Sequence, residues 1–177
     1  MNKIAIDTCV FLHLLNKDPQ TGVNEDSHID DLLRHPEVRK LRLCVDTTDK
    51  IRNEYQIHLD PIVRKQDDTR TEIYILRFWM EVGRRERIAT DTNGALMSRI
   101  REVIPEPNEH ADRAFVYVAC AGNCCLVTND GEHILPRRPE LKRKTRRHRG
   151  GNTDFLTSRE AVGHFLRSGT IHGSGAS

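Results

Sequence analysis

The stretch KIAIDTCVFLHLL, residues 3–15, predicts the fold class because it joins a short buried strand to an apolar helix. Ile4–Ile6 is the predicted strand, and an apolar run that begins at Val10 predicts a helix extending to about Asn16. Asp7 stands between them, where the hydrophobic pattern has no place for a charge. Such an acid is either an N-cap of the helix or part of a functional site.

The composition predicts one charge-rich globular domain. The chain has 177 residues, of which 37% are hydrophobic and 31% are charged, which is enough for one sizeable core. We expect a single domain over residues 1–168, followed by a Gly/Ser-rich disordered tail at 169–177. No run of about 18 apolar residues predicts a membrane span, and no secretion signal is visible.

The cysteines favour a reducing compartment. They are odd in number and fall in apolar segments, which is typical of free thiols rather than of a disulfide framework. We therefore expect a cytoplasmic protein with no membrane contact. A packed core is favoured over a zinc site, since the chain has no second CxxC and no paired histidines. The five cysteines are Cys9, Cys44, Cys120, Cys124 and Cys125.

Short apolar segments alternate with helical patterns along the chain. Strands arranged in this way pair in parallel, and the helices between them form right-handed crossovers. The sequence therefore predicts an α/β fold, a three-layer α/β/α sandwich with a central parallel sheet. The expected strands are Ile4–Ile6, Leu41–Thr47, Arg87–Thr90, Cys124–Thr128 and Asp154–Thr157.

Capping signals help to place the helices. Thr69 and Glu72 form a capping box before a helix that should end near Gly83. Thr157 and Glu160 repeat the pattern before the last helix. The other expected helices span about 28–33, 48–59, 95–103 and a segment from the predicted N-cap Asn108 to Gly122.

Four acids are predicted to meet at one edge of the sheet. Asp7 and Asp130 each follow a predicted strand, and sites in parallel sheets form beyond the carboxyl ends of the strands. Glu54 and Asp112 lie on the apolar, sheet-facing sides of their predicted helices. Singly, each acid is explained equally well as a cap, a turn residue or a salt-bridge partner.

Together, the four carboxylates require a counter-charge. No matching basic residue lies near them in sequence, and clustered carboxylates repel one another unless a divalent cation holds them. Oxygen ligands without a His/Cys pattern favour Mg²⁺ or Mn²⁺ over zinc. Such ions activate water for attack on a phosphodiester. The pattern therefore predicts a metal-dependent phosphodiesterase that acts on nucleic acid.

A concentrated basic segment follows Asp130. Residues 137–149, RRPELKRKTRRHR, carry a net charge of +7, which leaves −5 for the rest of the chain because the total is +2. We expect a basic loop at about 136–151 that attracts a polyanion toward the acidic site. The predicted nucleic-acid-binding residues are Arg137, Arg138, Lys142, Arg143, Lys144, Arg146, Arg147 and Arg149.

The order of the acids resembles that of the PIN-domain nucleases. The resemblance covers roughly residues 3–60 and 100–168, which is most of the chain. The segments that carry it are IAIDTCVFL at 4–12, IRNEYQIHL at 51–59, HADRAFVYVA at 110–119, LVTND at 126–130 and DFLTSREAVGHFL at 154–166.

The resemblance implies a ribonuclease that depends on Mg²⁺ or Mn²⁺. Members of this family often act on single-stranded RNA and often form homodimers. Some are endonuclease toxins of toxin–antitoxin modules, so the resemblance also implies a protein inhibitor as a partner. The catalytic and metal-binding residues would be Asp7, Glu54, Asp112 and Asp130, with Thr128 as a supporting hydroxyl.

Three features depart from the family pattern. Cys9 stands where many members have asparagine, the helix-rich region at about 60–92 is longer than in minimal toxins, and the basic loop is unusually long. Asn129 is expected in a turn that lines the site. His58 and His133 lie near the acids in sequence and could contact substrate.

Other interpretations remain open at this point. A catalytically silent PIN-like module would bind RNA or a protein partner, and retained RNA binding without divalent-ion binding would identify it. A phosphoaspartyl phosphatase needs a second acid two residues after the first, where this chain has Cys9. DNA also remains open as the nucleic acid.

Overall fold

Five parallel strands form one sheet, in a computed structural model that describes residues 2–15, 27–64, 71–89, 94–146 and 153–169. The spatial order is β3-β2-β1-β4-β5, so the first strand lies in the centre of the sheet. The predicted α/β fold with a parallel sheet is confirmed. The strands are β1 (Lys3–Ile6), β2 (Arg42–Asp46), β3 (Arg85–Ile88), β4 (Cys125–Val127) and β5 (Phe155–Leu156).

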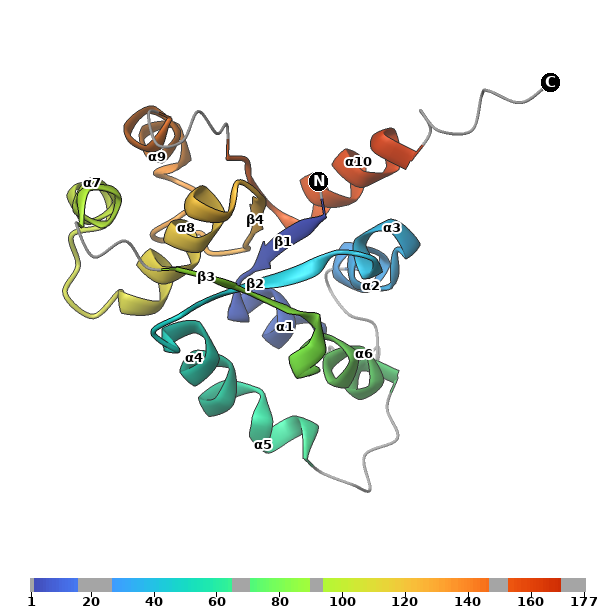
Figure 1. Cartoon of the computed structure of the whole chain (residues 1–177). Coiled ribbons are helices and arrows are strands. Elements are labelled where there is room, and N and C mark those ends of the chain that lie inside the picture. The colour runs from blue at the N-terminus through green and yellow to red at the C-terminus, as the bar shows by residue number, and fades with distance from the viewer. Residues whose placement is uncertain (1, 16–26, 65–70, 90–93, 147–152, 170–177) are drawn as a thin grey trace.

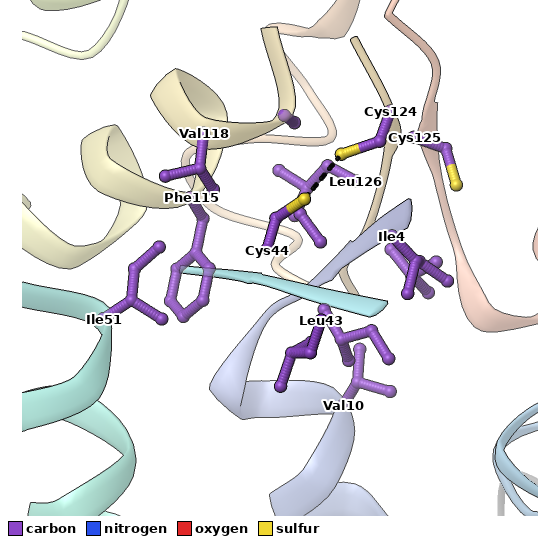
Figure 2. Close-up of a cluster of buried hydrophobic side chains, with 14 of the residues drawn as sticks. Ile4, Val10, Leu43, Cys44, Ile51, Phe115, Val118, Cys124, Cys125 and Leu126 are labelled. Atoms are coloured by element: carbon purple, nitrogen blue, oxygen red, sulfur yellow. Dashed lines mark hydrogen bonds between the residues drawn. The ribbon is translucent and has the colours of Figure 1, made fainter. Parts of the chain in front are cut away.

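Helices pack against the sheet and complete the α/β architecture (Figure 1). Figure 2 shows Phe115 and Val118 of α8 on one side of the strands and Val10 of α1 on the other. The helices are α1 (Thr8–Leu15), α2 (Ser27–Arg34), α3 (Pro36–Arg39), α4 (Lys50–His58), α5 (Asp60–Val63), α6 (Thr71–Met80), α7 (Ala95–Val103), α8 (His110–Gly122), α9 (Arg138–Thr145) and α10 (Ser158–Gly169), with a 3₁₀ turn at Val82–Arg84.

The carboxyl end of α8 packs closely on the sheet because it ends in glycine. A Cβ atom on Gly122 would lie 3.2 Å from Cδ1 of Ile88 and 3.5 Å from Sγ of Cys44. The next residue, Asn123, has a φ of 51° and ends the helix in the left-handed conformation, which asparagine tolerates better than most residues. The predicted end of this helix at Gly122 is confirmed.

The start of α8 differs from the predicted one. Asn108 was expected as the N-cap, but Glu109 holds that position, and its side chain makes no capping hydrogen bond. The loop before the helix is held instead by the buried guanidinium of Arg113, which donates to the carbonyl oxygen of Glu106 at 2.6 Å. The Glu109 carboxylate is therefore available to other groups.

The predicted capping box of the last helix is present. The backbone N–H of Glu160 donates to Oγ1 of Thr157 at 3.1 Å, and the N–H of Thr157 donates to Oε2 of Glu160 at 2.9 Å. Two backbone N–H groups at the start of α10 are thereby paired. The earlier box has Thr69 in a segment outside the described residues.

The cysteines are free thiols, as predicted. Four of the five are buried, and Figure 2 shows Cys44 and Cys124 facing each other, with the sulfur atoms 3.5 Å apart. Burial is the main cause that raises the pKa of Cys125 to about 12, which keeps this thiol protonated at neutral pH. In the described ranges, no helix is long and apolar enough to cross a membrane.

We predict that Leu126→Ala destabilises the protein by about 2–5 kcal/mol, because the side chain is fully buried in β4 and its loss leaves a cavity. Urea denaturation measures the change. Ile57→Ala is the matched control, since Ile57 is 67% exposed and its truncation should cost less than about 0.5 kcal/mol. Equal costs for the two variants would contradict the packing described.

Candidate metal centre

The centre begins at the carboxyl ends of β1 and β4. These strands pair in parallel with Ile6 opposite Val127, so the residues that follow them, Asp7 and Thr128, are neighbours. The N–H of Asp7 donates to the carbonyl oxygen of Val127 at 2.9 Å, and Oγ1 of Thr128 donates to Oδ2 of Asp7 at 2.7 Å. The sheet register therefore sets the position of the first carboxylate.

Asp7 is a buried acid whose negative charge has no basic side chain paired with it among the described residues. Its exposed fraction is 4%, and its second oxygen, Oδ1, accepts a long hydrogen bond from the N–H of Cys9 at 3.3 Å. Burial raises the pKa of Asp7, the Thr128 hydrogen bond opposes that rise, and the charge of Asp130 adds to it. Within the described ranges, no lysine, arginine or histidine lies within ion-pair distance of this carboxylate.

Asp130 organises the turn that follows β4. Its Oδ1 accepts the N–H of Glu132 at 2.8 Å, and its Oδ2 accepts the N–H of Ile134 at 2.8 Å. The N–H of Asp130 itself donates to Oγ1 of Thr128 at 3.0 Å. Both expected roles, turn residue and neighbour of Asp7, are thus present together. The turn also carries His133 toward the acids.

His133 lies among three carboxylates. Its Nδ1 atom is 3.2 Å from Oδ2 of Asp112, 3.8 Å from Oε2 of Glu109 and 3.8 Å from Oδ2 of Asp130. One ligand atom from each of His133, Glu109 and Asp112 lies within 4.8 Å of the others, a separation that one metal ion could bridge. The α8 helix therefore contributes two carboxylates, one at its N-cap and one in its first turn.

Asp112 is an acid whose pKa is strongly raised by its surroundings. Burial, a hydrogen bond shared with Glu109 and the charges of Asp7, Asp130 and Glu109 together raise the pKa of Asp112 to about 8. Every one of these causes disfavours the charged carboxylate. The group thus has an excess of negative charge that a bound cation would relieve.

No ion pair or hydrogen bond among the described residues joins Glu54 to the other acids. Glu54 lies on α4, and its described ion pair is with His58, whose Nε2 is 3.3 Å from Oε1 of Glu54. The charges that act most strongly on Asp112 come from other acids. The helix face was predicted correctly, since the adjacent Tyr55 is buried and donates to the carbonyl oxygen of Ile6. Its role as a metal ligand stays a prediction.

Asn129 and Cys9 support the edge of the centre. Oδ1 of Asn129 accepts Oγ of Ser158 at 2.7 Å and the N–H of the same residue at 3.1 Å, which ties the start of α10 to the end of β4. The Cys9 sulfur accepts the N–H of Asn129 at 3.3 Å and lies 3.6 Å from Oγ1 of Thr128. Burial and the charge of Asp7 raise the pKa of Cys9, so its role here is contact by a neutral thiol.

Within the basic segment, residues 138–145 form helix α9 where a loop was predicted. In α9, Leu141 and Thr145 are buried one helical turn apart, so the segment has a face that packs on the body of the protein. Pro139 lies in the first turn, where its missing N–H costs nothing. In the sequence, the many basic residues make the two buried positions of this helix hard to recognise.

Most of the described basic residues in this segment are paired with carboxylates. These pairs offset much of the positive charge that the sequence indicated, and they tie α9 to α7 and α10. They are Arg137–Glu106, Arg138–Glu160 at 2.8 Å, Lys142–Asp154 at 2.7 Å, Arg143–Glu140 at 3.1 Å and Lys144–Glu102.

Three predicted nucleic-acid-binding residues remain to be placed. Arg146 is exposed and has no carboxylate partner among the residues that the structure describes. Arg147 and Arg149 lie outside the described residues. The predicted loop is therefore corrected to a helix over Arg138–Thr145, and nucleic-acid binding by the basic residues stays a prediction.

Two residues enlarge the predicted group. Glu109 was expected beside a cap rather than in the centre, although its spacing of three residues from Asp112 places both on one helix face. His133 was expected near the acids, but its contact with three of them depends on the turn that Asp130 forms. That turn is local, but it depends on hydrogen bonds to the Asp130 carboxylate, which leave no periodic pattern in the sequence.

The donor set is compatible with a divalent cation. One ligand atom each from Glu109, Asp112 and His133 lies within reach of a single ion, and the charges of Asp7 and Asp130 act on Asp112 from nearby. Hard oxygen donors suit Mg²⁺ and Mn²⁺, and an imidazole is better tolerated by Mn²⁺. The chain matches no protein-family model, and no curated protein is significantly similar to it.

We predict that Asp112→Asn stabilises the metal-free protein near pH 7.5 by about 2 kcal/mol, allowing for the partial exposure of this side chain. The folded-state pKa of Asp112, about 8, lies above its ordinary value of 3.8. Its contribution to stability is therefore complete below about pH 4 and is lost as the pH rises toward 8.

Urea denaturation in EDTA at about pH 5 and pH 8 measures the effect. The gain from Asp112→Asn should be larger at pH 8. Asp31→Asn, in an exposed position on α2, is the control and should change little at either pH. A loss of stability in Asp112→Asn at pH 8 would contradict the charge repulsion described.

Proposed function

We propose that this protein is a metal-dependent nuclease of the PIN-domain type, an endoribonuclease that hydrolyses single-stranded RNA. The observation that carries the proposal is the convergence of Asp7, Asp112 and Asp130 on one edge of the sheet, with only His133 as a basic neighbour among the described residues. Carboxyls whose pKa is raised by burial and by neighbouring acids, as for Asp7 and Asp112, are typical of sites that bind a cation or transfer protons.

The fold supports the PIN-domain assignment at a coarser level. The sheet is parallel throughout, and the first acid follows its central strand β1. The order of Asp7, Asp112 and Asp130 along the chain agrees with the resemblance in sequence. Glu54 supports it less, because its described ion pair is with His58 on the same helix.

The residues of the centre would have different roles. Asp7, Asp112 and Asp130 would hold the ion, with Glu109 and His133 beside them. Mg²⁺ or Mn²⁺ in such a site activates water and offsets negative charge on a phosphodiester. Thr128 orients the Asp7 carboxylate through its 2.7 Å hydrogen bond. Burial of Asp7 removes water from behind the carboxylate and restricts its movement.

The test is cleavage of end-labelled single-stranded RNA in Mn²⁺ or Mg²⁺. We expect the wild-type chain to cut internally, and Asp7→Asn and Asp112→Asn each to lower the rate at least about 100-fold, since each removes a ligand at the centre. EDTA should abolish cleavage. A parallel assay with single-stranded DNA determines which nucleic acid is preferred.

The control for cleavage is Asp31→Asn, an exposed acid on α2 that should retain wild-type activity. Equal residual activity in this control and in the two site variants would contradict the assignment. Absence of cleavage by the wild-type chain, together with RNA binding that needs no metal, would instead identify a catalytically silent module.

A second prediction concerns stability with metal. Mn²⁺ at a hundred times its dissociation constant should stabilise the wild-type chain by about 2.7 kcal/mol, because the ion binds the folded state. Asp112→Asn should lose most of this gain, whereas Asp31→Asn should keep it. Thermal unfolding with and without Mn²⁺ measures both. An equal gain in all three proteins would place the ion elsewhere.

A further inference from the structure

A charged pocket of about 370 Å³ lies beside α7 and α9, outside the candidate metal centre. Arg99 and Glu102 line it from α7, and Arg143 and Lys144 line it from α9. The two helices pack against each other beside α8 (Figure 1). With three cations and one anion in its lining, the pocket has a net positive charge, in contrast to the acidic centre.

The charges in this pocket are only partly balanced. Lys144 pairs with Glu102, and Lys144 lowers the pKa of that carboxyl through a hydrogen bond and its charge. Arg99 acts on the same carboxyl more weakly, and it has no carboxylate within ion-pair distance in the described ranges. Arg143 pairs with Glu140, but its side chain is 68% exposed. The pocket therefore holds donors that a second anion could reach.

A short series of charged residues runs from the centre toward the pocket. His133 acts electrostatically on Glu106, and Glu106 pairs with Arg137 at the start of α9. From Arg137 to Lys144 the helix advances about 10 Å, at 1.5 Å per residue. A flexible polyanion bound at the centre could therefore reach the pocket with a short segment of its backbone.

We propose that this pocket binds the phosphate backbone of single-stranded RNA, and that Glu102 competes with a phosphate for Lys144. The identification of this RNA as substrate rests on the proposed nuclease function. The acidic centre repels a polyanion, so a separate cationic surface is needed to attract one. Exposed ion pairs contribute little to stability, so a phosphate can replace Glu102 beside Lys144 at small cost.

The first test measures RNA affinity without catalysis. Fluorescence anisotropy of a labelled single-stranded RNA in EDTA, over about 50 to 200 mM NaCl, gives both the dissociation constant and its salt dependence. The double variant Arg99→Ser/Arg143→Ser should bind roughly tenfold more weakly at low salt. Its salt slope should fall by roughly 1.4, since each single-strand phosphate contact contributes about 0.7.

The matched control removes two cations on another side of the molecule. Arg34 lies in α2 and Lys40 follows α3, and each pairs with a carboxylate as Arg143 does, at 2.8 and 2.6 Å. Arg34→Ser/Lys40→Ser therefore makes the same change in net charge and should leave affinity and salt slope near their wild-type values. An equal effect of both double variants, or an unchanged slope in the pocket variant, would overturn the assignment.

A third variant tests the competition. Glu102→Gln removes the internal anion and should raise RNA affinity roughly threefold, in the opposite direction to the arginine variant. An unchanged or weaker affinity would overturn the competition between Glu102 and phosphate. Matching unfolding midpoints establish that each variant is folded.

The outcomes separate this inference from the proposed function. Salt-dependent RNA binding through the pocket, without cleavage in Mn²⁺, would support the pocket and refute the nuclease. Cleavage with normal RNA binding in Arg99→Ser/Arg143→Ser would support the nuclease and refute the pocket. If the wild-type chain binds no RNA, the assignment of the pocket to RNA is wrong, and an acidic protein becomes the alternative ligand.

Discussion

The hydrogen bond from Thr128 to Asp7 is the interaction on which the candidate centre depends. It joins the residues that follow two neighbouring strands, and it exists because β1 and β4 pair in parallel with Ile6 opposite Val127. The same threonine oxygen accepts the N–H of Asp130, which forms the next turn. A single buried hydroxyl thus relates two carboxylates from distant parts of the sequence.

The centre opposes the stability of the fold that contains it. Burial raises the pKa of Asp7, and burial together with neighbouring acids raises that of Asp112 to about 8. A core selected for stability alone would have no reason to gather these groups. Such local cost is a recognised property of functional sites. The excess of negative charge at the centre requires a cation there, and a separate basic surface is needed to bind the RNA.

The sequence predicted the features that depend on backbone periodicity. Parallel strands carry Asp7 and Asp130 to one edge by topology alone, so their proximity could be inferred from hydrophobic patterns. The features that depend on side-chain partners distant in sequence could not be inferred in this way. The packed face of α9 and the position of His133 among the acids depend on partners distant in sequence, whereas the pairing of Glu54 with His58 is a local i,i+4 contact within α4.

In the proposed nuclease, three acids at this edge hold one divalent ion. Anomalous diffraction at the manganese edge from a crystal soaked in Mn²⁺ tests this most directly. We expect a peak bounded by the carboxylates of Asp7, Asp112 and Asp130, and no such peak in Asp112→Asn. A fully occupied Mn²⁺ elsewhere, with these three carboxylates unliganded, would contradict this binding.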